Sequence, residues 1–223
     1  MSNEWSARKA KKTAVYRLSF TFGGLLLPES QVVADAYLRL RSWADVRSEI
    51  LDRNLLQKTR RESSRRYVRE IRDRLKGAYE WELSIVAGRR GTKHEAKLVV
   101  FAITARYYHL VWEFIVEVIR YKTAGSDFKM LGFEFESFWE QKAENSPEMR
   151  NITDATRRKL IQVAYRMLQE AGILPGSRDG MIVAPTVPYG LSMRYAEEGD
   201  AETLMAFLLP DHEIQRLREI GKG

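Results

Sequence analysis

Basic side chains concentrate in one stretch, residues 54–75, NLLQKTRRESSRRYVREIRDRL. It holds eight of the 37 lysines and arginines. Guanidinium and ammonium groups neutralise phosphates, and arginines and hydroxyls also hydrogen-bond base edges. At about 100° per residue, six cations of this region form one stripe beside an apolar helix face. The stripe residues are Lys58, Arg61, Arg65, Arg69, Arg72 and Lys76. This spacing indicates binding of a polyanion.

Local pairing divides the basic residues into two groups. Glu62 and Glu70 each stand four residues before an arginine, the order that favours an ion pair. Arg61, Arg65 and Arg72 have no acid four residues away in either direction. We therefore interpret the stripe as uncompensated charge that contacts DNA phosphates. The alternatives are a solvated helix face, an RNA contact or an acidic protein partner.

A helix-turn-helix would present this stretch to DNA. We predict a short helix over 43–52, a tight turn over 53–58 with Asn54 as its stop residue, and a long helix over 59–82. In this motif the second helix places its N-terminal residues in the major groove. We therefore expect Arg60, Ser63 and Ser64 to approach base edges.

A second helix is predicted over 153–171. Thr153 is its expected N-cap and Gly172 its C-cap. Cations crowd its first turn, where the helix dipole disfavours them unless an anion is near. The candidate DNA contacts here are Arg157, Arg158, Lys159 and Arg166. A β-hairpin wing near 172–185 would complete a winged-helix-like element, and an ordinary amphipathic helix is the alternative.

Charge is distributed unevenly along the 223 residues. Residues 1–123 contain 25 Lys+Arg and 14 Asp+Glu, a net of +11, whereas residues 124–223 contain 12 and 16, a net of −4. The two sum to +7. We predict a flexible basic tail (1–13), a basic helical lobe (14–123) and an acidic helical lobe (124–223). The expected fold is all-α, a compact multi-helix protein with two helix-turn-helix-like elements.

Other segments carry structural predictions. YRLSFTFGG alternates apolar and polar residues, which indicates a docked extended arm, and the apolar stretch within a helix over 94–122 carries charges that argue against a membrane span. The acidic, aromatic segment 128–140 favours a different function. If its rings Phe133, Phe135, Phe138 and Trp139 are exposed, they would form the protein-binding patch of a scaffold.

Catalytic patterns are missing from the sequence. Cysteine is absent, and His94, His109 and His212 are widely separated, with His109 expected in the core. We expect Glu113 and Glu117 to pair with Arg106 or Arg120 rather than to act as acid and base. The sequence thus predicts a cytoplasmic, monomeric non-enzyme without cofactor or metal.

Several motifs together resemble a known family. They are YRLSFTFGGLLLPES at 16–30, WADVR at 43–47, NLLQKTR at 54–60, REIRDRL at 69–75 and TRRKLIQVAYRMLQEAGIL at 156–174. In this order they resemble the BrxA family, small core proteins of bacteriophage exclusion (BREX) defence systems, over roughly residues 14–175.

The resemblance implies an all-α protein with helix-turn-helix elements that binds double-stranded DNA without catalysis. It also implies partner proteins, namely a DNA adenine methyltransferase, an ATPase, a phosphatase-like protein and often a Lon-like protease. A suggested similarity of the family to the NusB fold keeps RNA as the alternative ligand.

Overall fold

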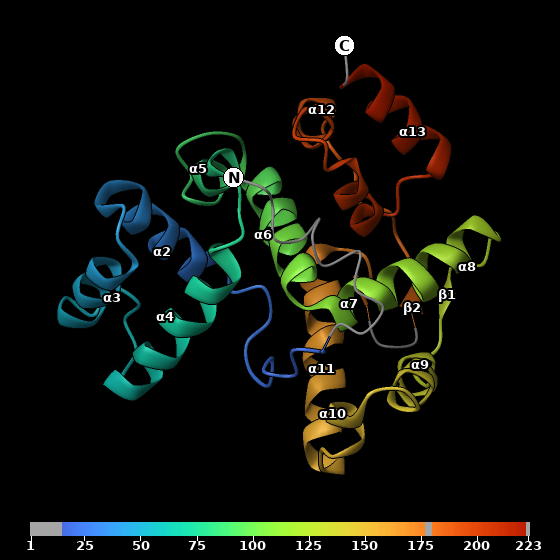
Figure 1. Ribbon diagram of the computed structural model, residues 1–223, viewed down its shortest axis with the longest axis horizontal. Helices are drawn as coiled ribbons and strands as arrows, with labels where there is room; N and C mark the ends of the chain where they lie inside the picture. The colour runs from blue at the N-terminus through green and yellow to red at the C-terminus, as the bar shows by residue number, and fades with distance from the viewer. Residues whose placement is uncertain (1–14, 177–179, 222–223) are drawn as a thin grey trace. The chain divides into compact units, whose positions relative to one another are not determined.

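The fold is all-α, as predicted (Figure 1). The computed structural model describes residues 15–176 and 180–221, so the predicted basic tail at 1–13 lies outside the described residues. Within them the chain forms two compact units: unit 1 comprises 26–107, and unit 2 comprises 15–25 together with 108–221. The charge-based lobes 14–123 and 124–223 stay a prediction.

The described residues of unit 1 form five helices in chain order. They are α2 (Leu27–Leu40), α3 (Trp43–Asp52), α4 (Arg61–Leu75), α5 (Glu80–Val86) and α6 (Lys93–Tyr107). Pro28 occupies the first turn of α2, where its missing N–H costs nothing. Ser42 caps α3 by accepting a hydrogen bond from the Asp45 N–H at 3.3 Å. Helices α2, α3 and α4 pack against one another, and α4 also contacts α6.

The predicted long helix over 59–82 is wrong, because α4 ends at Leu75 and α5 begins at Glu80. Tyr79 has extended backbone at the N-cap of α5, and its N–H donates to the Glu82 carboxylate at 2.9 Å. The connection from α3 to α4 is also longer than expected and spans residues 53–60. Asn54 does adopt the predicted left-handed conformation, with φ 47°.

The predicted helix over 94–122 is interrupted at Tyr108, where φ is −101° and ψ is 87°. Unit 2 continues with α7 (His109–Glu113), a π-helix η1 (Phe114–Ile119) and α8 (Arg120–Ala124). No single helix in the described part of the chain is long and apolar enough to span a membrane. The length and composition needed for a span are reached only when two segments separated by a bend, Lys93–Tyr107 and His109–Ala124, are taken together.

The rest of unit 2 is helical except for one small sheet. Its helices are α9 (Glu134–Ala143), α10 (Pro147–Arg150), α11 (Asp154–Ala171), α12 (Tyr189–Glu197), the 3₁₀ helix η2 (Ala201–Phe207) and α13 (Asp211–Ile220). Both predicted caps of α11 are confirmed: the Thr153 side chain accepts from the Thr156 N–H, and Gly172 has φ 88°. Gly172 suits this left-handed position because it has no Cβ.

The small β structure predicted near 172–185 is present. Strand β2 (Gly180–Met181) pairs antiparallel with β1 (Lys129–Met130), and Lys129 stands opposite Met181. The N–H of Val183 also donates to the Ile173 carbonyl at 2.9 Å, which joins the two sides of the predicted hairpin.

The predicted docked arm is confirmed for residues 15–25, which have no regular secondary structure and belong to unit 2. Phe20 is fully buried, and its ring lies 4.7 Å from that of Tyr108. Two glutamates hold the backbone of the arm: Tyr16 N–H donates to Glu148 at 2.9 Å, and Leu25 N–H donates to Glu170 at 2.6 Å.

Three aromatic rings of the segment 128–140 lie in the core. Phe135, Phe138 and Trp139 are at most 3% exposed, and the Phe135 ring lies 4.2 Å from that of Phe114. Phe133 alone of the four predicted patch residues is exposed, at 59%. The expected four-ring protein-binding patch is therefore wrong, because α9 turns three of these rings into the core of unit 2.

Candidate nucleic-acid interface

Helix α4 presents its basic side chains by burying its opposite face. Val68, Ile71 and Leu75 are at most 2% exposed and lie on the side that packs against α2, α3 and α6. Arg61 and Arg65 lie on the outer face, with half or more of each side chain exposed. The amphipathic pattern thus places Arg61 and Arg65 on the surface, as the sequence predicted.

The stripe is, however, largely compensated. Four of its six cations have carboxylate partners: Lys58 with Glu29 (2.8 Å), Arg61 with Asp52 (2.8 Å), Arg65 with Glu62 (3.4 Å) and Arg72 with Asp73 (2.7 Å). Arg69 and Lys76 have no side-chain partner among the described residues. The prediction of an uncompensated stripe is therefore wrong for the four, because Glu29 comes from α2, Asp52 from α3, and Glu62 and Asp73 from spacings other than four.

These four ion pairs differ in how far their cations are exposed to solvent. Lys58 has only a quarter of its side chain exposed, and its ammonium lies 4.2 Å from the centre of the Tyr67 ring. Arg72 is similarly covered, with 28% of its side chain exposed. Exposed pairs such as those of Arg61 and Arg65 contribute only about 0–1 kcal/mol, so a phosphate can replace the carboxylate. We assign Lys58 and Arg72 a mainly structural role.

The residues expected near base edges are only partly accessible. Arg60 is exposed and has no side-chain partner among the described residues, and Ser63 is half-buried. Ser64 is 2% exposed, so it does not reach a nucleic acid in this structure. Helical spacing already indicates this burial, because Ser64 lies four residues before Val68 on the apolar face.

Replacing Ser64 with alanine is expected to leave duplex binding unchanged and to raise stability by up to about 1 kcal/mol. The Ser64 hydroxyl is buried and has no hydrogen-bond partner in the described part of the chain, a costly state that alanine removes. Urea denaturation and a duplex titration measure both effects. Ser63→Ala is the matched control, and a destabilised Ser64→Ala protein would show that the hydroxyl makes a stabilising contact.

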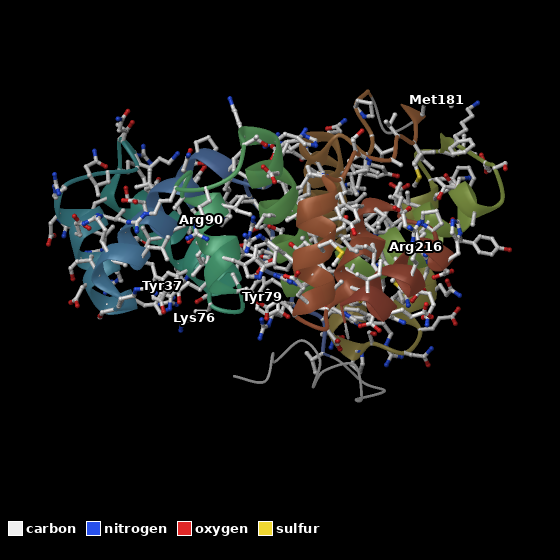
Figure 2. All side chains as sticks on the ribbon, turned by 90° about the horizontal axis from the view of Figure 1, so that it is seen from above. Tyr37, Lys76, Tyr79, Arg90, Met181 and Arg216 are labelled. Atoms are coloured by element: carbon white, nitrogen blue, oxygen red, sulfur yellow. The ribbon has the colours of Figure 1, made fainter. Side chains whose placement is uncertain are left out.

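Unit 1 carries excess positive charge that its own carboxylates do not balance. Residues 26–107 contain 18 Lys+Arg and 11 Asp+Glu, a net of +7. Nine of the 11 carboxylates are in ion pairs, and Glu95 instead accepts hydrogen bonds from Thr92. Seven cations of this range have no side-chain partner among the residues that the structure describes, and Figure 2 labels two of them, Lys76 and Arg90. The seven are Arg47, Arg60, Arg69, Lys76, Arg90, Lys93 and Lys97.

Four of these seven were not among the predicted site residues: Arg47, Arg90, Lys93 and Lys97. No sequence signal distinguishes these four cations from cations that form ion pairs. Arg89 and Arg90, for example, are neighbours of the same type. Only the structure shows that Asp35 engages Arg89, at 2.8 Å.

The predicted α11 contacts lie in unit 2. Arg158 has no side-chain partner in the described chain, the Lys159 ammonium donates to Gln162 at 3.1 Å, and Arg166 donates to the Gly23 carbonyl at 3.5 Å. Arg157 is 3.8 Å from a Glu140 oxygen and 4.0 Å from an Asp154 oxygen.

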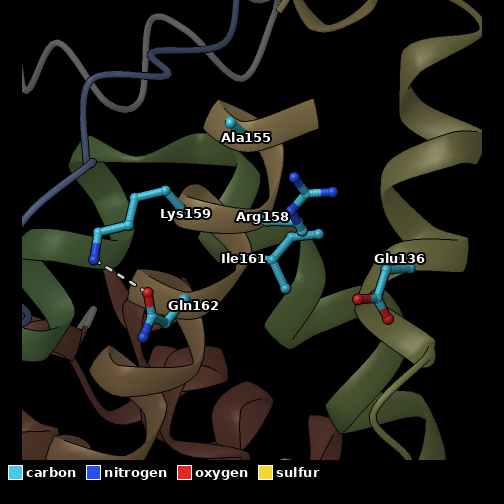
Figure 3. A pocket seen from close by; sticks show the side chains of 6 residues that line it. All are labelled: Glu136, Ala155, Arg158, Lys159, Ile161 and Gln162. Atoms are coloured by element: carbon cyan, nitrogen blue, oxygen red, sulfur yellow. Dashed lines mark hydrogen bonds between the residues drawn. The ribbon is translucent and has the colours of Figure 1, made fainter. Parts of the chain in front are cut away.

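An open pocket of about 300 Å³ lies beside these α11 residues (Figure 3). Arg158 and Ile161 face Glu136 of α9 across it, whereas Lys159 and Gln162 lie on another side of the helix. The Glu136 carboxylate disfavours an anion in this pocket.

The Glu113–Glu117 pair differs from the prediction. Lys142 of α9, not Arg106 or Arg120, pairs with both carboxylates, at 2.8 and 2.7 Å. Arg106 instead pairs with Glu82, and Arg120 donates to the Leu209 carbonyl and to Asp211. Among the described residues no group of three or more His, Asp or Glu side chains is placed to hold a metal ion.

Glu113 is the hub of a hydrogen-bond network that holds the arm. It accepts from the Tyr16 hydroxyl at 2.6 Å and lies 2.8 Å from half-buried His109, which is hydrogen-bonded as predicted but not in the core. Burial alone would raise the pKa of Glu113, yet hydrogen bonds from His109, Lys142 and Tyr16 outweigh it and lower the pKa to about 2. Burial and the bond to Glu113 raise the pKa of Tyr16.

Acid is therefore expected to destabilise the arm through Glu113. A carboxylate with a lowered folded-state pKa adds stability above its ordinary value of 4.5, and this stability is lost as the pH falls toward about 2. Thermal melts of the wild type and Glu113→Gln between pH 5 and 2.5 should converge as the pH falls. A constant difference in melting temperature would contradict this. Glu117→Gln, which alters a more exposed carboxylate on the same lysine, is the control.

Comparison with known proteins decides the family. The BrxA family model matches residues 14–193, which include both α4 and α11. The chain belongs to the BrxA family. A Paramagnetospirillum magneticum protein described as "BREX protein BrxA" is 26% identical over 194 residues, covering 84% of this chain and 92% of that protein. Membership of the BrxA family supports a role in phage defence.

A solved structure shares the BrxA-family fold. It is the crystal structure of an uncharacterized protein from Magnetospirillum magneticum, with a TM-score of 0.74 and 24% identity over 87% of this chain and 98% of that one. This likeness concerns the fold alone and assigns no ligand to α4 or α11.

Proposed function

We propose that this BrxA-family protein is a non-catalytic, double-stranded-DNA-binding component of a BREX phage-defence system. In this proposal it acts in the cytoplasm, as a monomer, with the methyltransferase, ATPase and phosphatase-like proteins of the system. The observation that carries the proposal is the net charge of +7 on unit 1, together with the exposed cations of α4.

On α4, phosphate contacts would replace weak carboxylate contacts. Among the described residues no carboxylate pairs with Arg60, Arg69 or Lys76, so a phosphate displaces none there. The ion pairs of Arg61 and Arg65 are exposed and contribute little free energy. Each phosphate that these side chains neutralise releases condensed counterions from the duplex, which favours association. The proposed contact set is thus Arg60, Arg61, Arg65, Arg69 and Lys76, with Arg157, Arg158, Lys159 and Arg166 of α11 as a weaker second set.

The mode of contact is mainly electrostatic. The α3–α4 connection of residues 53–60 is longer than the three or four residues usual in a helix-turn-helix. Ser64 is buried, which leaves Arg60 and Ser63 as the side chains nearest to a base-reading role. We therefore expect weak sequence preference and strong salt dependence.

The proposal is tested by titrating the full chain with a short duplex at several salt concentrations. Affinity should fall by orders of magnitude between about 50 and 200 mM salt if several phosphates are contacted. A flat salt dependence would overturn DNA binding through this surface. Competition between the duplex and a structured RNA decides the alternative, because preferential displacement by RNA would replace DNA as the ligand.

A further inference from the structure

A second pocket lies in unit 1 and has no stripe residue in its lining. Its volume is about 440 Å³, within the range of roughly 300–1,000 Å³ that small-molecule sites occupy. The first two turns of α2, the α5–α6 loop and the start of α6 form it. The lining residues are Leu27, Pro28, Gln31, Gly88, Gly91, Thr92, Lys93 and Ala96.

The α5–α6 loop is held in place by polar contacts. The Arg89 guanidinium donates to the Asp35 carboxylate at 2.8 and 3.0 Å, and the Thr92 N–H and hydroxyl donate to Glu95 at 2.7 and 3.0 Å. Gly91 has φ +72°, a backbone conformation that L side chains rarely adopt. The Glu95 carboxylate already accepts hydrogen bonds from Thr92 at the start of α6, so the helix end itself is not the ligand site.

One cation of the lining remains available. Lys93, the first residue of α6, is exposed and has no side-chain partner in the described part of the chain, while the Glu95 carboxylate is engaged by Thr92. Lys97 follows one turn after Lys93, and like charges four residues apart cost a few tenths of a kcal/mol. An anionic group at the pocket mouth would remove this repulsion and pair with Lys93.

The rest of the lining suits an apolar body with one polar edge. Leu27, Pro28 and Ala96 supply apolar surface, and the Gln31 amide offers both donors and an acceptor. The Gln31 nitrogen lies against Gly88, 2.7 Å from where a Cβ would stand, so glycine at this position lets the Gln31 amide pack against the loop.

We propose that this pocket binds a nucleoside phosphate, with the phosphate on Lys93 and the base against Leu27, Pro28 and Ala96. The source is either a free nucleotide or an unpaired nucleotide of a strand. This site goes beyond the proposed duplex contact, because it involves other residues and a ligand that a paired duplex does not present.

Binding of deoxyadenosine monophosphate to the full chain tests the site by calorimetry. Deoxyadenosine and inorganic phosphate should each bind at least about tenfold more weakly, since each lacks half of the ligand, and Lys93→Glu should weaken nucleotide binding at least about tenfold. Arg47→Glu, an equal charge change at an exposed cation outside the pocket, should have no effect. Both altered side chains are exposed, so both variants should keep the wild-type melting temperature.

A single strand of about ten nucleotides separates the two sources. If the strand binds tightly, the mononucleotide binds weakly and Lys93→Glu abolishes binding of the strand, the ligand is an unpaired nucleotide. If the strand and the mononucleotide bind with comparable affinity, the ligand is a free nucleotide. No binding of either near 1 mM, or equal binding by the wild type and Lys93→Glu, overturns the proposal. Absence of duplex binding in the titration would contradict only the proposed α4 interface and would leave this pocket proposal unaffected.

Discussion

Replacing Arg61, Arg65 and Arg69 with glutamate is expected to abolish duplex binding while leaving the fold intact. Each lost phosphate contact lowers the slope of log affinity against log salt by about 0.9, so three contacts remove nearly 3 from it. At physiological salt this corresponds to a loss of roughly a hundredfold or more. The melting temperature should change little, because the pairs of Arg61 and Arg65 are exposed and Arg69 has no side-chain partner among the described residues.

A control variant with the same change in net charge distinguishes a local contact between α4 and DNA from a general attraction between the protein and DNA. Lys129, Arg150 and Arg216 are exposed cations of unit 2, and changing them to glutamate alters the net charge by the same amount. This control should retain most of the affinity and the salt slope. Equal losses in both triple variants would mean that net charge alone attracts DNA. A large fall in the melting temperature of the α4 variant would mean that the stripe is structural.

Helix ends were predictable where local residues determine them. Thr153 and Gly172 mark the two ends of α11 because a hydroxyl and a missing Cβ act within one turn. The breaks at residues 76–79 and at Tyr108 were not predicted. The cap of α5 depends on Glu82, a residue that also fits the interior of a longer helix.

Pairing across the tertiary structure was the main limit on predicting the site. Glu29 reaches Lys58 from 29 residues away, and Asp52 reaches Arg61 from the preceding helix. Spacing of three or four residues detects only pairs within one helix, such as Glu70–Arg74, which the structure confirms at 2.9 Å. The net charge of the region was therefore predictable, but the particular cations that carry it were not.

The largest stability effect is expected at the buried ion pair of unit 1. The Arg106 guanidinium contacts both Glu82 oxygens at 2.6 Å, and the two side chains are 5% and 0% exposed. Removing one partner leaves an uncompensated buried charge, which typically costs about 3–5 kcal/mol. Glu82→Ala also removes the acceptor for the Tyr79 N–H at the start of α5. Urea denaturation should therefore show a large fall in the midpoint for this variant.

Two further variants test whether burial is the cause. Glu80, two residues earlier in α5, pairs with Arg41 on the surface, so Glu80→Ala should leave the urea midpoint nearly unchanged. Combining Glu82→Leu with Arg106→Met replaces both charges by apolar groups of similar size and should recover much of the lost stability. A loss below about 1 kcal/mol in Glu82→Ala would mean that Arg106 reaches another partner or water once the carboxylate is removed. No recovery in the double variant would instead identify the cap at Tyr79 as the main contribution of Glu82.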